Sequence, residues 1–177
     1  MRKQNRRFVI ACGICLFFTL ILSCGYAFAP QGEYIDKQIK TVYVQSFENK
    51  TSQAELENYV RTAFIDQFIL SGRFKIVQSV ELADAIVKGS ILNINTAPLS
   101  YRVNTLVAEE RAMMILEISF REKESGKNIW NSKNVAGQVD YQMEDNINSF
   151  PTTRRNAYIK LSNDAAEKAF NMMMSGF

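Results

Sequence analysis

The cysteine at position 24 stands in a context that predicts covalent attachment of lipid. Residues 21–23 read Ile-Leu-Ser, so a branched side chain lies three positions before Cys24 and a small one directly before it. A lipoprotein signal peptidase cleaves before such a cysteine, whose thiol carries diacylglycerol. We therefore expect a diacylglycerol and an N-acyl chain on Cys24 and no other cofactor. An uncleaved N-terminal anchor with an incidental cysteine is the alternative, since Leu22 is bulkier than the residue usual at its place.

The residues before Cys24 have the composition of an export signal. Residues 1–7 contain four basic side chains and no acidic one, and residues 8–23 contain no charge. A basic segment followed by a short apolar one is typical of a secretory signal peptide. The apolar segment is shorter than the about 20 residues that a membrane-spanning helix needs. We therefore predict a cleaved signal peptide over residues 1–23.

Few other residues could act as catalysts. The sequence has no histidine, and its two other cysteines, Cys12 and Cys15, lie inside the predicted signal peptide. This excludes His-based triads, His-containing zinc sites and thiol nucleophiles in the mature chain. The sequence also contains no nucleophile elbow and no phosphate-binding glycine loop. It therefore predicts a protein that is not an enzyme and has no metal site.

Neighbouring carboxylates are the remaining candidates for general acid–base chemistry. The candidates are Glu109 with Glu110, Glu122 with Glu124, and Glu144 with Asp145. Acidic residues at the ends of strands are usually solvated and have no catalytic role. A hydrolase that uses such a pair stays open as the least favoured hypothesis.

Arginine and tyrosine side chains form the candidate binding site. Tyr101 and Arg102 lie in a predicted loop, and Arg111 and Arg121 lie on one face of a predicted strand. Arginine suits phosphate because its guanidinium donates paired hydrogen bonds. These four residues could bind an anionic, partly apolar ligand. The alternative is an ordinary polar sheet edge without a ligand.

Processing changes the charge of the chain and fixes the size of the domain. The full chain has 21 basic and 18 acidic residues, and removal of residues 1–23 leaves 17 basic against 18 acidic. The mature chain therefore has no excess of positive charge, and we expect no nucleic-acid partner. Its 154 residues can form one domain that buries roughly 70% of its unfolded surface. We predict a lipidated tether over residues 24–38 and a single domain over residues 39–177.

The clearest predicted element is a helix that follows the first strand. Residues 39–47 are β-branched and aromatic and predict a strand with apolar side chains on both faces. Ser52 and Glu55 have the spacing of a capping box. Apolar residues then recur at helical spacing, and Gly72 lies where a helix end favours a left-handed residue. The predicted apolar stripe comprises Leu56, Tyr59, Val60, Ala63, Phe64 and Phe68.

The rest of the chain predicts four strands and a final helix. The expected strands are residues 73–78, 85–95, 110–122 and 128–141, with a loop over 96–104 and a hairpin turn at Gly126. Pro151 begins the last helix, in which Arg154 and Arg155 oppose the helix dipole and suggest another role. The order β-α-β-β-β-β-α predicts an α+β fold, a two-layer sandwich. We expect a mainly antiparallel sheet of four to five strands with both helices on one face.

Several short motifs resemble those of the LPS-assembly lipoprotein LptE family. Cys24-Gly25-Tyr26 resembles the mature start of that family, and further matches extend to about residue 92. They are Ile39-x-x-Val42-x-Val44-x-x-Phe47-x-Asn49-x-Thr51, Leu56-Glu57, Gly72-Arg73-Phe74, Ala83-Asp84-Ala85 and Gly89. Beyond residue 92 the resemblance rests on the order of elements. Other envelope lipoproteins share the strand-turn-helix part.

The resemblance implies a function in the envelope. Proteins of this family partner a large LptD-like β-barrel and contact lipopolysaccharide on its way to the outer leaflet. The resemblance also implies a lipid-anchored protein on the periplasmic face of the outer membrane. Gly25 after the cysteine is compatible with that location. The alternative is a lipoprotein scaffold or regulator of another envelope system, in secretion, the flagellum or peptidoglycan synthesis.

Overall fold

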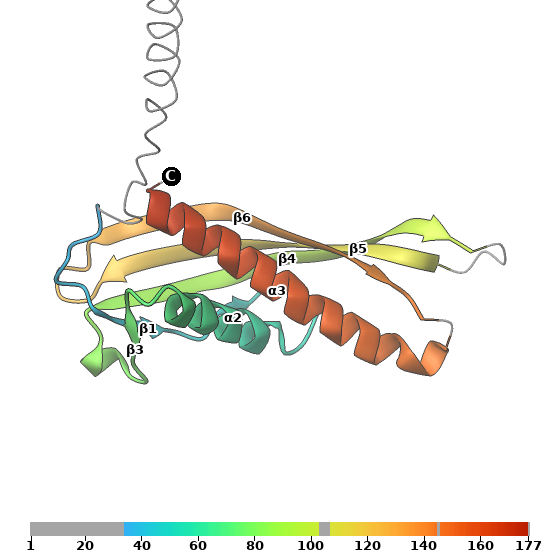
Figure 1. Cartoon of the computed structure of the whole chain (residues 1–177), viewed down its shortest axis with the longest axis horizontal. Helices are drawn as coiled ribbons and strands as arrows, with labels where there is room; N and C mark the ends of the chain where they lie inside the picture. Colours follow the sequence, from blue (N-terminus) through green and yellow to red (C-terminus); the bar gives the residue numbers. More distant parts are fainter. Residues whose placement is uncertain (1–33, 103–106, 145, 177) are drawn as a thin grey trace, which may run out of the picture. The chain divides into compact units, whose positions relative to one another are not determined.

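The computed structural model describes residues 34–102, 107–144 and 146–176, and these form an α+β domain (Figure 1). Cys24 and the predicted signal peptide lie outside the described residues. The strands are β1 (Thr41–Val44), β2 (Glu48–Asn49), β3 (Lys75–Ile76), β4 (Ala85–Tyr101), β5 (Val107–Glu122) and β6 (Asn128–Gln142). The helices are α2 (Leu56–Leu70) and α3 (Phe150–Ser175), with 3-10 turns η1 (Val80–Leu82) and η2 (Ile147–Ser149).

The sheet is mixed and has the strand order β3-β1-β4-β5-β6, with β2 beside β4. The long strands β4, β5 and β6 pair antiparallel, as predicted. The short strands pair in parallel, β1 with β3 and β4, and β2 with β4. The connection through α2 brings the chain back to the end of the sheet where β1 begins. β3 therefore runs in the same direction as β1, and the two strands pair in parallel. The sheet has six strands instead of the expected four to five, since residues 48–49, which follow the first predicted strand, form β2.

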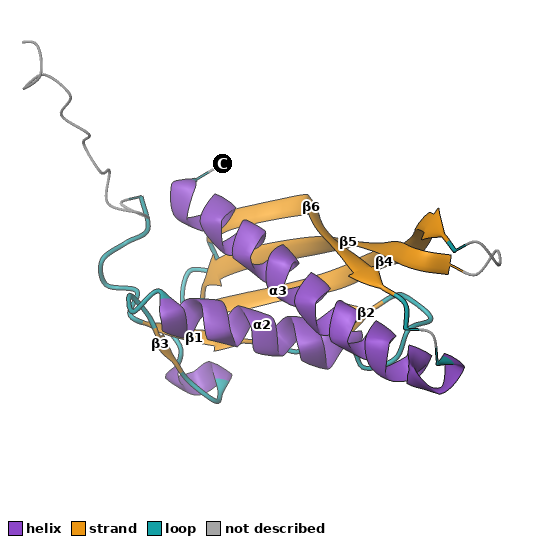
Figure 2. Ribbon diagram, turned by 45° about the vertical axis from the view of Figure 1, so that its right-hand side comes forward, coloured by secondary structure: helices purple, strands orange, loops and turns teal. Residues whose placement is uncertain are grey.

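Both helices cover one face of the sheet (Figure 2). Side chains of β5 alternate between the two faces of the sheet, and five of those that face the helices are at most 1% exposed. They are Ala112, Met114, Leu116, Ile118 and Phe120. Phe68 of α2 stands at the centre of this core, with ring centroids 5.1 Å from Phe170 and 5.9 Å from Phe120. Such aromatic pairs contribute about 0.5–1.5 kcal/mol beyond the area that they bury.

The predicted capping box is wrong. Glu55 precedes α2 in a left-handed conformation with φ 68°, and no side chain caps the helix. The Asn49 side-chain oxygen accepts hydrogen bonds from the Thr51 N–H and hydroxyl, so a polar turn occupies the residues before the helix. The Glu55 carboxylate instead accepts a hydrogen bond from Tyr59 at 2.8 Å. The predicted apolar stripe and the left-handed Gly72 are confirmed, with φ +63° at Gly72.

The predicted loop over residues 96–104 is wrong for residues 96–101, because β4 continues to Tyr101, and residues 103–104 lie outside the described residues. Pro98 lies opposite Glu110 of β5, and the register shifts between Pro98 and Ser100. Proline breaks a central strand because it lacks an N–H group, but an edge strand tolerates it. The pairing of β2 with β4 ends at Ile91. Pro98 therefore lies where β4 has become an edge of the described sheet.

Residues before β1 already pack against the domain, and the last described element is the predicted helix. Ile35, within the predicted tether, is 1% exposed, and its carbonyl accepts a hydrogen bond from Arg73 at 3.1 Å. Pro151 stands in the first turn of α3, where its missing N–H costs no hydrogen bond. Neither α2 nor α3 has the length and apolar content to cross a membrane.

Candidate functional site

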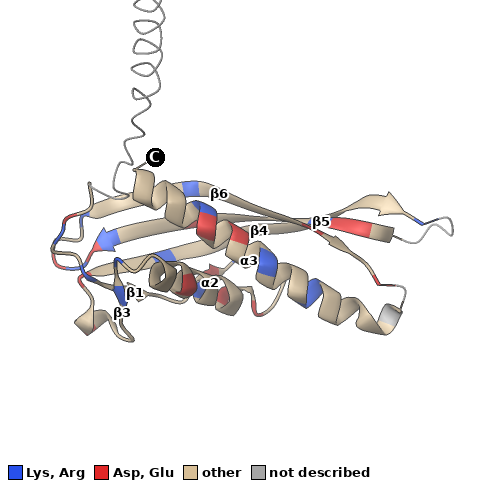
Figure 3. Ribbon diagram, in the orientation of Figure 1, with Lys and Arg blue, Asp and Glu red and all other residues tan. Residues whose placement is uncertain are grey.

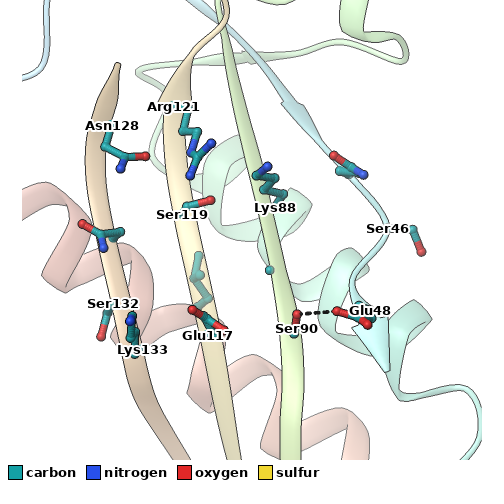
Figure 4. A pocket seen from close by; sticks show the side chains of 14 residues that line it. Ser46, Glu48, Lys88, Ser90, Glu117, Ser119, Arg121, Asn128, Ser132 and Lys133 are labelled. Carbon is teal, nitrogen blue, oxygen red and sulfur yellow. Dashed lines mark hydrogen bonds between the residues drawn. The ribbon is translucent and has the colours of Figure 1, made fainter. Parts of the chain in front are cut away.

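The helix-free face of the sheet carries a groove of about 460 Å³ over β4, β5 and β6 (Figure 4). Its volume falls within the range of ligand sites, about 300–1,000 Å³. The outward-facing residues of this part of the sheet are polar and line the groove, whereas the inward-facing ones form the core. Apart from Gly89 and Ile118, the residues that line it are polar or charged.

Strand register arranges the groove residues as three rows across the sheet. Arg121 of β5 lies opposite Asn128 of β6. The next row joins Lys88, Ser119 and Asn131, which are opposite one another on β4, β5 and β6. The third row joins Glu48, Ser90 and Glu117 on β2, β4 and β5. Residues two apart in a strand are about 6.8 Å apart, so the rows span roughly 13–14 Å.

The two ends of the groove differ in charge. Arg121 lies at one end, with Lys88 in the next row. Glu117 and Glu48 lie at the other end, where Lys133 stands beside Glu117 (Figure 4) and Lys50 pairs with Glu48 at 3.3 Å. Glu48 accepts a hydrogen bond from the Ser90 hydroxyl at 2.9 Å, and this bond and Lys50 lower its pKa. Over the helix-bearing face of the domain, acidic and basic side chains are interspersed (Figure 3).

Arg121 has a buried guanidinium nitrogen that lacks a protein acceptor. Its Nε is shielded from solvent and has no hydrogen-bond partner among the described residues. Most buried polar atoms in native proteins are hydrogen-bonded, so such an atom needs an explanation. Arginine has donors only. The partner that would satisfy Arg121 must therefore supply an oxygen or another acceptor.

The four predicted binding residues do not form one site. Tyr101 is 64% exposed at the far end of β4, and Arg102 donates a hydrogen bond to the carbonyl of Met143. Arg111 pairs with Asp140 through two hydrogen bonds of 2.7 Å, and this pairing lowers the pKa of Asp140. Arg121 lies ten residues further along β5 than Arg111, which is about 34 Å in an extended strand.

Sequence reasoning missed a polar cluster between the sheet and α3. Glu110 is 7% exposed, accepts a hydrogen bond from the Tyr141 hydroxyl, and pairs with Arg154 at 3.3 Å. Burial and the neighbouring Glu110 raise the pKa of Tyr141 far above its usual range. Arg154 lies near the positive end of the α3 dipole, which is unfavourable for a cation. Its pairing with this buried carboxylate explains why an arginine stands there. The pattern offered one signal for the contact, the unfavourable arginines at the helix start.

Glu109 and Glu110 have different contacts, and Asp145 of the third predicted carboxylate pair lies outside the described residues. Glu110 faces α3, whereas Glu109 accepts a hydrogen bond from Ser100 at 3.3 Å. Glu122 accepts one from Ser125 within the hairpin turn. The described residues contain no group of three side chains placed to hold a metal ion.

Comparison with known families decides the affiliation of this domain. The family profile described as LptE, lipopolysaccharide-assembly, matches residues 39–173. The chain belongs to the LptE family. The match covers α2, all six strands that the structure describes and α3 up to residue 173, so the resemblance seen in the first part of the chain extends into the last helix. No curated protein sequence matches the chain.

Solved structures share the fold of this LptE family member at low sequence identity. Uncharacterized lipoprotein B from Nitrosomonas europaea is 13% identical with a TM-score of 0.50, over 86% of this chain and 92% of its own. A protein from Xanthomonas campestris is 6% identical with a TM-score of 0.52, over 77% of this chain and 83% of its own. At these identities the likeness concerns the fold alone.

Proposed function

We propose that the chain is a non-enzymatic outer-membrane lipoprotein that partners an LptD-like β-barrel in lipopolysaccharide transport and assembly. The family match over residues 39–173 carries this proposal. The basic and apolar segments before Cys24 support export and lipid attachment at that residue. The anchored domain would then act at the periplasmic face of the outer membrane.

The far half of the β4–β5 hairpin supplies one candidate surface for a protein partner. Three apolar side chains there are well exposed: Leu99 at 43%, Tyr101 at 64% and Met113 at 39%. Exposed apolar surface on a soluble domain marks interaction sites, and a tyrosine of this exposure provides large contact area with a polar tip. Partner contact at this end leaves the groove at the other end of β5 accessible.

Co-purification from membranes tests the proposal. The full-length lipoprotein is extracted in mild detergent and its stoichiometric partner identified by mass. We expect a large outer-membrane β-barrel together with lipopolysaccharide. A partnerless protein would contradict the proposal, and a pore of a secretion system or a peptidoglycan synthase would replace it with the scaffold hypothesis.

A matched pair of variants tests the contact surface. Leu99→Lys places a charge in the exposed apolar part of the hairpin and should reduce recovery of the barrel at least fivefold. Leu82→Lys is the control, because Leu82 is 67% exposed in η1, just before the opposite end of β4. Equal recovery with both variants would exclude this surface as the contact.

A further inference from the structure

We infer that the domain docks on the lipid bilayer through an apolar patch at the end where the described chain begins. The patch consists of Ile69 and Leu70 at the end of α2 and of Val80 and Leu82 in η1. The inference rests on the lipid attachment proposed for Cys24 and adds a second, non-covalent contact with the same membrane. The surface that it contacts is the boundary between headgroups and acyl chains in the leaflet that holds the anchor.

The patch lies beside the first described residues of the chain. The C-terminal end of α2, the turn η1 and the start of the described chain lie at one end of the domain (Figures 1 and 2). Arg73, which follows the end of α2, donates a hydrogen bond to the carbonyl of Ile35 at 3.1 Å. The Tyr34 hydroxyl donates one to the carbonyl of Met173, near the end of α3. The ends of α2 and α3 line one hollow of about 290 Å³, to which Leu70 contributes.

The side chains of the patch are exposed without a packing partner that would explain their apolar character. Leu70 is 78% exposed, Ile69 58% and Leu82 67%, and Val80 is also exposed. Large apolar side chains grouped on a surface mark interaction sites. Tyr34 is exposed beside them, and tyrosine is enriched where membrane meets water. Because a bilayer surface is wider than the domain, it can contact the end of α2 and η1 together.

The charges at this end favour apolar docking over electrostatic attraction. Residues 34–40, 66–84 and 122–128 hold six basic and six acidic side chains together, and residues 169–176 at the end of α3 hold none. The turn after β5 belongs to the same end, since the Lys123 N–H donates a hydrogen bond to the carbonyl of Asp84. Balanced charge gives no net attraction to anionic headgroups, so the contact should depend little on salt.

A few exposed apolar side chains suffice for docking because the anchor keeps them near the bilayer. Tyr34 is the tenth residue after Cys24, so the patch stays within a few tens of ångströms of the acyl chains. A contact made by a tethered group is effectively intramolecular, with an effective concentration of about millimolar for short linkers. Side chains too few to hold a free protein on a membrane can therefore orient an anchored one.

Quenching by lipid-borne nitroxides tests the inference in the full-length lipoprotein, reconstituted from mild detergent into phosphatidylcholine vesicles. The chain after the predicted cleavage has no cysteine besides Cys24. Leu70→Cys or Leu82→Cys therefore provides a single free thiol for the fluorophore NBD. Thr152→Cys is the matched reporter, because Thr152 is exposed in the first turn of α3, about 30 Å along the helix from Met173. Quenching at positions 70 and 82 should be at least threefold stronger than at 152, also in 1 M NaCl.

A charge within the patch should weaken the contact. Leu70→Asp should reduce the quenching of a label at position 82 at least twofold, because a carboxylate is costly to move among acyl chains. Ile159→Asp is the matched control, since Ile159 is an exposed apolar residue of α3 outside the patch. It should leave the quenching within 1.2-fold. Both substituted side chains are exposed, and thermal melting checks that both variants stay folded.

The other outcomes would overturn the inference. Weak and equal quenching at positions 70, 82 and 152, with acyl chains found on Cys24 by mass spectrometry, would exclude docking and leave the anchor intact. Equal effects of Leu70→Asp and Ile159→Asp would exclude the patch as the contact. A blue shift of the label at position 70 that grows with protein density, without quenching by lipid, would assign the patch to a second copy of the chain. An unmodified Cys24 would overturn the inference together with the anchor.

Discussion

The arginines of this domain show how strongly the surroundings of one residue type determine what it contributes. Arg111 makes a bidentate pair with Asp140, but both side chains are exposed, at 37% and 47%. Such surface pairs contribute about 0–1 kcal/mol. Arg154 contacts a carboxylate that is almost fully buried, so its loss leaves an unneutralised group inside the protein. Arg121 has a buried nitrogen with no acceptor among the described residues.

Glu110→Ala should destabilise the domain by about 1–3 kcal/mol, because the Tyr141 hydroxyl and Arg154 both lose their acceptor. Urea unfolding followed by circular dichroism measures the change. Glu109→Ala is the control, since Glu109 accepts a long hydrogen bond of 3.3 Å from Ser100 instead of lying in the buried cluster. That variant should stay within about 0.5 kcal/mol of the parent. Equal losses in the two variants would show that the buried cluster contributes nothing specific.

Asp84 should make the stability of the domain depend on pH in the acid range. Its carboxylate accepts hydrogen bonds from the N–H groups of Lys40 at 2.9 Å and Thr41 at 2.8 Å, and these bonds lower the pKa of Asp84. Because the folded-state pKa is below that of the unfolded chain, the stabilisation is present above about pH 3.9. It is lost as the pH falls through the folded value.

Asp84→Asn tests this linkage, because it removes the charge and keeps the shape. The variant should be less stable than the parent at pH 7, and the difference should shrink at pH 3, as measured by urea unfolding at both values. A difference that is the same at both values would show that the carboxylate charge does not contribute.

Among the elements, α3 approaches β6 closely because small residues face each other. An added Cβ at Gly137 would lie 2.7 Å from the Cβ of Ala165 and 3.1 Å from the carbonyl oxygen of Leu161. Ala165, Ala166 and Ala169 of α3 are all fully buried. The helix can therefore lie directly on the strand, and the N–H of Gln138 in β6 reaches the Asp164 carboxylate of α3 at 2.8 Å.

Gly137→Ala should destabilise the domain by about 1–3 kcal/mol through overpacking of this contact. Adding Ala165→Gly should recover part of the loss, although a glycine inside a helix costs about 1 kcal/mol by itself. A double-mutant cycle from thermal or urea unfolding measures the coupling between the two positions. Strictly additive effects would contradict direct contact between the strand and the helix.

At the scale of the whole molecule, the proposed anchor and the described domain are joined by a short segment. Tyr34 is the tenth residue after Cys24, and ten residues of extended chain span at most about 33–36 Å. The domain is tied down from Tyr34 onward, since the Tyr34 hydroxyl donates a hydrogen bond to the carbonyl of Met173 in α3. A lipidated Cys24 would therefore hold the domain close to the bilayer surface.

Cys24→Ser should release the protein from the membrane fraction. Several acyl chains, each contributing about 0.8 kcal/mol per buried methylene, anchor a protein stably where one chain does not. Fractionation and mass spectrometry of the mature N-terminus measure the effect. The parent should carry the mass of the acyl chains at residue 24, and the variant should not. An unmodified Cys24 or a mature start further along the chain would exclude the lipid anchor.

The sequence by itself determined the local elements, because their signals lie within a few residues. Alternation in β5, the apolar stripe of α2 and the left-handed turn at Gly126 all follow from periods of two and 3.6 residues and from backbone sterics. Only the tertiary structure decided the mixed strand order, the strand through Pro98 and the pairing of Glu110 with Arg154. It also separated Arg121 from Arg111 and placed Arg121 in a groove with Lys88 and Glu117. Those features depend on which distant residues become neighbours, and that is set by register and packing across the whole domain.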